Sequence, residues 1–160
     1  MARNGVDSII QNTADAYWGN GMRVAIGERL GIAKLHLDLR RGDGPPAARH
    51  YNFAALTAHE RIISEHREVA AGALRAIVKA QKILKADPSI STEVGQRLFP
   101  ADEAELIAGL IERDAPFYDA EITHDAVNGL MNFARAYGLI KDAVPYEGLV
   151  ATPFSHLWKE

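Results

Sequence analysis

The chain has 160 residues, close to the ~150 residues of one typical domain. Its 18 Lys+Arg and 21 Asp+Glu give a formal net charge of −3, which argues against a nucleic-acid-binding surface. Cysteine is absent, which excludes disulfides, thiolate catalysis, iron–sulfur clusters and cysteine-based zinc sites. With 48 % hydrophobic residues, the chain has enough apolar material to bury a core.

The residues that follow Met1 contain no apolar run of about 7–15 residues, so we expect no secretory signal peptide. No stretch reaches the ~18 consecutive apolar residues of a membrane span. As written, the chain is expected to be cytoplasmic. Its strand-like beginning looks like a chain that starts in the middle of a fold.

The first 57 residues predict a β-α-β-β order. Residues 5–12 form a short β-type run, and residues 13–30 predict a helix whose first turns could instead be a loop around residues 18–21. Residues 35–40 alternate apolar and polar side chains, which is typical of a half-buried strand. A Gly/Pro-rich turn follows, and residues 51–57 are the third strand candidate.

From residue 58 to residue 160 the pattern is helical. Residues 65–85 carry an apolar stripe at steps of three and four, and Pro88 follows the end of this helix. Further helices are predicted at 92–98 and 102–113, and another one starts after a Thr123 cap and ends at Gly138. The tail, residues 145–158, predicts a short helix or turn that docks Phe154 and Trp158.

Motifs for catalysis or metal binding are not evident. His59 and His66 are seven residues apart, about two helical turns or ~10.5 Å, too far for one metal ion to bridge comfortably. The loop at residues 42–46 lacks the Lys-Ser/Thr ending of a phosphate loop. No serine lies in a Gly-x-Ser-x-Gly elbow. We therefore predict no catalytic residue, no metal and no cofactor.

The most promising polar cluster lies near the start of the chain. Strand ends and the helix starts that follow them are where open α/β sheets bind ligands, and polar groups beside an aromatic ring are typical of small-molecule clefts. The alternative is that the polar side chains satisfy turn backbone and that the aromatic rings belong to the core. The candidate ligand-binding residues are Asp7, Ser8, Asn12, Tyr17 and Trp18.

The order of several motifs resembles the substrate-binding proteins of ABC importers for nitrate, sulfonates and taurine, and the related thiamine-pyrimidine synthase-like group. Gly5-Val6-Asp7-Ser8-Ile9-Ile10 is similar to the strand that precedes a helix in that family. His66-Arg67-Glu68-Val69 with Leu74-Arg75-Ala76 resembles its Pro-Glu-x-Val … Leu-Arg-Ala helix, with His66 in place of Pro. The segment from Phe133 to Ile140 and the Leu157-Trp158 tail are similar to its last helices.

This resemblance implies an α/β fold: part of a periplasmic-binding-protein type II fold, with a sheet of about three strands before a mostly helical part. Residues 1–57 would be the remnant of the second ligand-binding lobe, and residues 58–160 the C-terminal helical segment. Family members are about twice this length, so the chain would correspond to the C-terminal half. Asp7, Ser8 and Asn12 would then lie on the cleft edge.

The implied function is that of a non-enzymatic solute-binding component of an ABC importer, or a half-length fragment of one. Its ligand would be a sulfonate, a nitrate-like anion, an aromatic carboxylate or a pyrimidine, bound weakly or not at all by half a cleft. By resemblance the partner is an ABC permease and the location is periplasmic. Two alternatives are a stand-alone helical interaction domain and, less favoured, a thiamine-pyrimidine synthase-like enzyme. Because sheet edges and apolar surface would be exposed, we also expect a homodimer.

Overall fold

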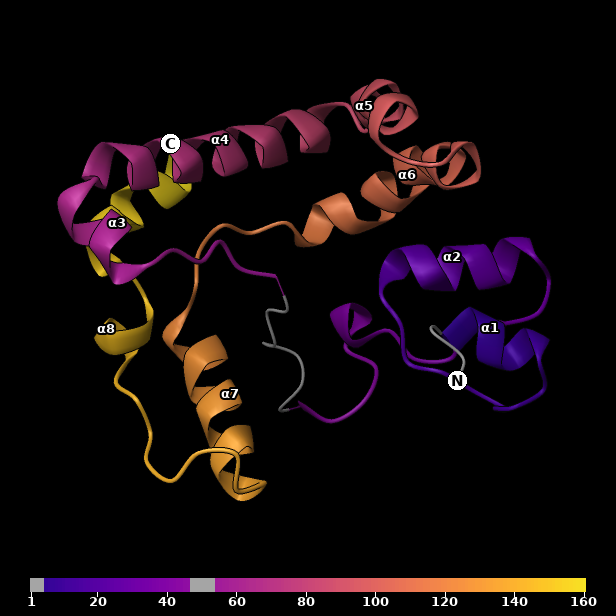
Figure 1. The fold of residues 1–160 in the computed structure, drawn as a ribbon, viewed down its shortest axis with the longest axis horizontal. Coiled ribbons are helices and arrows are strands. Elements are labelled where there is room, and N and C mark those ends of the chain that lie inside the picture. Colours follow the sequence, from indigo (N-terminus) through magenta and orange to yellow (C-terminus); the bar gives the residue numbers. More distant parts are fainter. Residues whose placement is uncertain (1–4, 47–53) are drawn as a thin grey trace. The chain divides into compact units, whose positions relative to one another are not determined.

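The computed structural model describes residues 5–46 and 54–160, and every regular element in these ranges is a helix (Figure 1). The predicted α/β class is therefore wrong for the described chain. The α-helices are α1 (Gly5–Ile10), α2 (Gly21–Arg29), α3 (Glu60–Glu65), α4 (Arg67–Ala86), α5 (Ile90–Leu98), α6 (Ala101–Asp114), α7 (His124–Ala136) and α8 (Tyr146–Leu149). Short 3-10 helices are η1 (Leu39–Arg41), η3 (Ala115–Phe117) and η4 (Thr152–Lys159).

The three predicted strands are absent from the described residues. Residues 5–10 form α1: Val6, Ile9 and Ile10 also fit helical spacing, and the packing of this segment on α2 decides between the two patterns. Residues 35–38 have no regular structure and lead into η1. An alternating segment this short needs a neighbouring strand to satisfy its backbone, and no such strand is described. Of the third candidate, residues 54–57 are irregular and residues 51–53 lie outside the described ranges.

The predicted helix at residues 13–30 is shorter than expected. It begins at Gly21, where the side chain of Asn20 accepts a hydrogen bond from the backbone N–H of Arg23 at 3.1 Å. This is an ordinary N-cap, because a helix start leaves backbone N–H groups without partners inside the helix. Residues 13–20 contain no helix, so the loop that the sequence allowed around residues 18–21 is longer and starts earlier.

The later helices confirm the sequence prediction closely. Thr123 caps α7 by accepting a hydrogen bond from the N–H of Ala126 at 3.1 Å. Gly138 has a φ of 68°, a left-handed conformation that favours glycine, and it follows the last turn of α7. The 20-residue α4 covers residues 67–85 of the helix predicted at 65–85, and the separate short helix α3 ends at Glu65.

The apolar stripe predicted for α4 is not its buried face. Val69 is 63 % exposed and Ile77 is also exposed, whereas Ala71 and Val78 are buried. The face that carries Ala71 packs against residues of η4, so tertiary contacts, and not the width of the apolar stripe, select which side of α4 is covered.

Contacts divide the chain into two compact units, each built from two separate segments. The first unit comprises Met1–Asp38 and Ile83–Tyr118, and the second comprises Leu39–Lys82 and Asp119–Glu160. In the first unit α1 packs on α2, α2 on α6, and α5 on α6 (Figure 1). Among the described helices, none has both the length and the apolar character that crossing a bilayer requires.

Buried residues of the first unit are mostly small. Val6, Gly27 and Ala104 are buried, and a Cβ placed on Gly95 would lie 3.6 Å from the Cα of Ala104. In the second unit α7 contacts α8, and the rings of His124 and Tyr146 stack with their centroids 3.7 Å apart. Phe154 of η4 is buried as predicted, while Trp158 is only half-buried.

Candidate functional site

The predicted ligand-binding residues lie on α1 and on the loop that joins it to α2. Asp7 and Ser8 are in α1, and their carbonyl oxygens accept hydrogen bonds from the N–H groups of Gln11 and Thr13, both at 2.9 Å. Asn12 follows with a φ of 52°, a left-handed conformation that asparagine tolerates better than most residues. The left-handed backbone of Asn12 therefore lies just after the end of α1.

Tyr17 is placed by packing. Its hydroxyl donates a hydrogen bond to the carbonyl oxygen of Arg23 at 2.9 Å, which ties the loop to α2. Its ring lies against Gly5, and its hydroxyl lies against Gly27. Burial raises the pKa of the Tyr17 phenol, and the nearby Glu28 carboxylate raises it further. These contacts make Tyr17 a structural residue of the first unit.

Trp18 has the opposite environment, because its side chain is 78 % exposed. An indole in solvent offers a face on which a planar ligand can stack. Of the five predicted residues, Asn12 has a left-handed backbone at the end of α1, and Tyr17 packs against α2 and bonds to its backbone. The side chain of Trp18 is exposed to solvent. Asp7 and Ser8 share the neighbouring helix α1.

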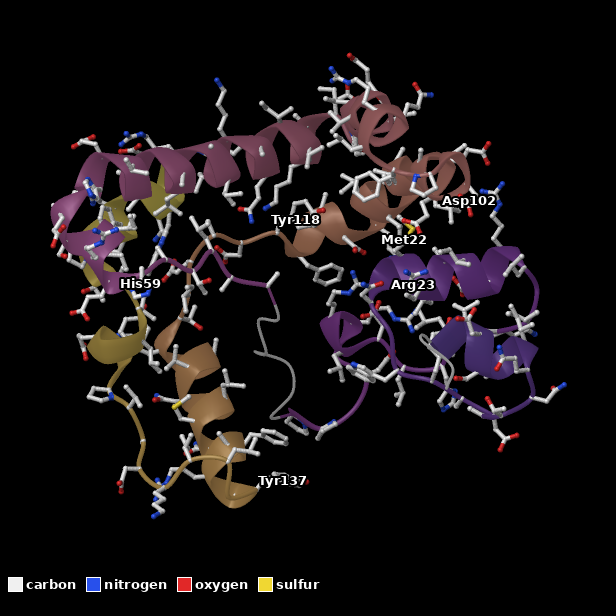
Figure 2. All side chains as sticks on the ribbon, viewed as in Figure 1. Met22, Arg23, His59, Asp102, Tyr118 and Tyr137 are labelled. Carbon is white, nitrogen blue, oxygen red and sulfur yellow. The ribbon has the colours of Figure 1, made fainter. Side chains whose placement is uncertain are left out.

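A set of ion pairs links α2 to α6, and sequence reasoning did not find it. Arg29 Nη2 lies 2.6 Å from Glu105 Oε2, and its Nη1 donates to the carbonyl oxygen of Asp102 at 3.1 Å. Arg23 Nη1 lies 4.0 Å from Glu103 Oε1. Figure 2 labels Arg23 on α2 and Asp102 on α6. These partners are more than 70 positions apart in the chain, and no local pattern marks them. The Arg29–Glu105 pair is largely exposed, so it contributes little to stability.

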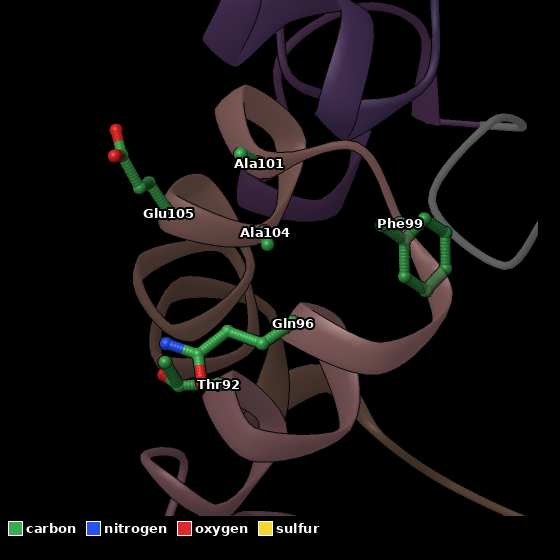
Figure 3. Close-up of a pocket in the computed structure, with 6 residues that line it drawn as sticks. All are labelled: Thr92, Gln96, Phe99, Ala101, Ala104 and Glu105. Atoms are coloured by element: carbon green, nitrogen blue, oxygen red, sulfur yellow. The ribbon is translucent and has the colours of Figure 1, made fainter.

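A hollow of about 220 Å³ lies between α5 and α6 (Figure 3). Its volume is below the roughly 300–1,000 Å³ of typical small-molecule pockets, and its polar groups are one hydroxyl, one amide and one carboxylate. In the sequence, the only signal near this hollow is Phe99-Pro100, which ends the predicted helix at 92–98. The lining residues are Thr92, Gln96, Phe99, Ala101, Ala104 and Glu105.

A second, wide-open hollow is formed by the four consecutive residues 57–60, which include His59, the residue before α3. Because one short stretch forms it, it cannot surround a ligand. Neither of these two hollows is lined by the five predicted site residues. In the part of the chain that the structure describes, no three His, Asp or Glu side chains gather as a metal site would require.

In comparisons with known proteins, no family model, no curated protein and no solved structure matches this chain.

Proposed function

We propose that this chain serves as a solute-binding component of an ABC importer, or as a half-length fragment of one, for a small organic solute. The ligand would be a sulfonate, a nitrate-like anion, an aromatic carboxylate or a pyrimidine. An ABC permease would be its partner, and a periplasmic location follows from the same resemblance.

The observation that carries the proposal is where the resembled motifs fall. The segment from Phe133 to Ile140 includes the last turn of α7 and its left-handed Gly138. Leu74-Arg75-Ala76 lies inside α4, and Leu157 of the Leu-Trp tail is the most buried large side chain described. These motifs at a helix end, inside a helix and in the core support the proposal, whereas Gly5–Ile10, which resembles a strand of the family, forms the helix α1 and does not.

The first contact for a ligand would be the segment from α1 to Trp18. Trp18 supplies an open ring for an aromatic carboxylate or a pyrimidine, and Asp7 would hold a ring nitrogen or an amine. An anionic head group would be held by backbone N–H groups outside this chain. Binding by the chain alone is therefore expected to be weak.

A thermal-shift screen with aromatic carboxylates, sulfonates and pyrimidines tests the proposal. A ligand present at about ten times its Kd stabilises the folded state by about 1.4 kcal/mol, which corresponds to a rise in Tm of about 3 °C or more for a chain of this size. We expect at least one class to produce such a rise. Trp18→Ala should abolish it, whereas Tyr137→Ala should not, because Tyr137 is a comparably exposed aromatic (71 %) that follows α7 in the other unit.

A panel in which no ligand class raises Tm contradicts the proposal and favours a second candidate, a helical interaction domain. One specific observation favours that candidate. Leu130, Phe133 and Tyr137 lie on one side of α7 at spacings of three and four, and all three are exposed. The Phe133 and Tyr137 rings contact each other with centroids 4.5 Å apart. A homodimer that paired these stripes would remove them from water.

A further inference from the structure

An exposed apolar stripe runs along α4, within the part of this helix that belongs to the second unit. Val69 is 63 % exposed and Ile77 is 46 % exposed, and they lie four residues before and four residues after the exposed Ala73. Ala76 and Ala80 are exposed on the same side of the helix. Because apolar residues at steps of three and four share one side of a helix, these five side chains form one surface about 17 Å long.

Two charged side chains of opposite sign lie along one edge of this stripe, near its two ends. Glu68 precedes Val69, and Lys79 precedes Ala80. They are 11 residues apart, which is close to three full turns, so both project on the same side of α4. Lys79 is exposed, and Glu68 is 94 % exposed with Arg75 Nη2 at 3.8 Å. This edge of the stripe is therefore acidic near the start of α4 and basic further along.

The stripe and its charges are self-complementary about Ala73. If the α4 of a second copy packs antiparallel with the two-fold axis at Ala73, Val69 of each copy lies against Ile77 of the other, because both are four residues from the axis. Glu68 of each copy then lies near Lys79 of the other, since the midpoint of this pair falls between residues 73 and 74. Parallel packing would instead place like charges together at both ends.

We propose that the exposed stripe of α4 is the surface through which two copies of this chain pair, with their α4 helices antiparallel. The stripe supplies the affinity, because Val69 and Ile77 of both copies leave water. The charge pairs select the antiparallel orientation. A stripe of this length covers less than the ~800 Å² that each partner contributes to a standard interface, so the dimer dissociates in the micromolar range. This pairing does not depend on the solute-binding proposal.

Sedimentation velocity of the full chain at low salt, from about 1 µM to about 300 µM, measures the Kd of the dimer. We expect the mass of the parent to rise from that of one chain towards that of two. Glu68→Lys and Lys79→Glu should each raise the Kd about tenfold, because both charge pairs of the dimer become repulsive. Lys141→Glu makes the same change of charge at an exposed lysine outside α4 and should leave the Kd unchanged.

An equimolar mixture of the Glu68→Lys and Lys79→Glu proteins tests the orientation. One copy then has lysine at both positions and the other has glutamate at both, so an antiparallel pair regains two attractive contacts. The mixture should therefore dimerise as the parent does, although neither variant does so alone.

Ala73→Glu tests the position of the axis, because it places two carboxylates next to each other there. We expect this variant to stay monomeric with unchanged helical ellipticity. The proposal is overturned if the parent remains a monomer over the whole range of concentration, or if Ala73→Glu leaves its dimer intact. It is also overturned if the charge variants and Lys141→Glu do not differ, or if Tyr137→Ser at the end of α7 abolishes the dimer, which would place the contact on α7.

Discussion

Tyr17 packs against two glycines, Gly5 and Gly27, which have no side chains. A Cβ placed on Gly5 would lie 2.3 Å from the ring, and one placed on Gly27 would lie 2.7 Å from the hydroxyl oxygen. Distances below 3.0 Å require something to move. Because the hydroxyl also donates to the Arg23 carbonyl, the loop before α2 depends on this one side chain.

Replacing Tyr17 by phenylalanine removes the hydroxyl and leaves the ring. The free energy of unfolding should fall by about 1 kcal/mol, because the carbonyl of Arg23 loses its donor. Urea unfolding followed by circular dichroism measures this loss. Tyr137→Phe, on the exposed end of α7, is the control and should unfold as the parent does.

The same variant should change how stability depends on pH. Burial, and then the Glu28 carboxylate, raises the pKa of Tyr17 above the ordinary tyrosine value of 10.0, so the unfolded chain loses this proton at lower pH than the folded chain. The contribution is fully present below pH 10 and is lost as pH rises through the folded-state pKa. Tyr146 acts in the same direction, through burial and then Glu121 and Glu147. Above pH 10 the parent should therefore lose stability more steeply than Tyr17→Phe, and equal slopes would contradict this role.

At the scale of the helices, two helical glycines differ in the space around them: Gly27 is closely packed, and Gly109 faces open space. Gly27 of α2 is buried against the Tyr17 hydroxyl, and a Cβ there would also lie 3.1 Å from the Cβ of Ala33. Gly109 of α6 has nothing within 4 Å of such a Cβ. Alanine is the better helix former at both positions by roughly 1 kcal/mol, so only packing separates them.

We expect Gly109→Ala to raise the free energy of unfolding by about 0.5–1 kcal/mol. Gly27→Ala should instead lower it by about 1–3 kcal/mol, because the added methyl group displaces Tyr17 or the backbone. Chemical denaturation of both variants under the same conditions measures the difference. Equal changes of the same sign would show that the contact between Gly27 and Tyr17 does not form.

The sequence predicted the helices from α4 to α7 well, because long apolar periodicities, the Thr123 cap and the Gly138 stop are local signals. It failed where the signals were short. The run at residues 5–12 fits a strand or a helix, and only its packing on α2 decides between them. In the candidate site, the sequence named Trp18 and Tyr17 together as aromatic residues. It could not show that Tyr17 is packed, because that packing depends on glycines at positions 5 and 27. The ion pairs between α2 and α6 join partners too far apart in the chain to predict.

At the scale of the whole molecule, the described part of the first 46 residues is helical and irregular and contains no strand. Under the proposed function, a ligand would meet the side of a helical unit that carries Trp18, and not the edge of a sheet. The exposed apolar side chains of α7 belong to the other unit, so the two candidate functions use different units.

Backbone NMR chemical shifts of the full chain measure whether this part of the molecule is helical or forms strands. We predict Cα shifts displaced in the helical direction over Gly5–Ile10 and Gly21–Arg29, and shifts near random-coil values over residues 35–38. Strand-type shifts over residues 5–12 and 35–40, with cross-strand proton contacts between them, would contradict the structure and restore the predicted sheet.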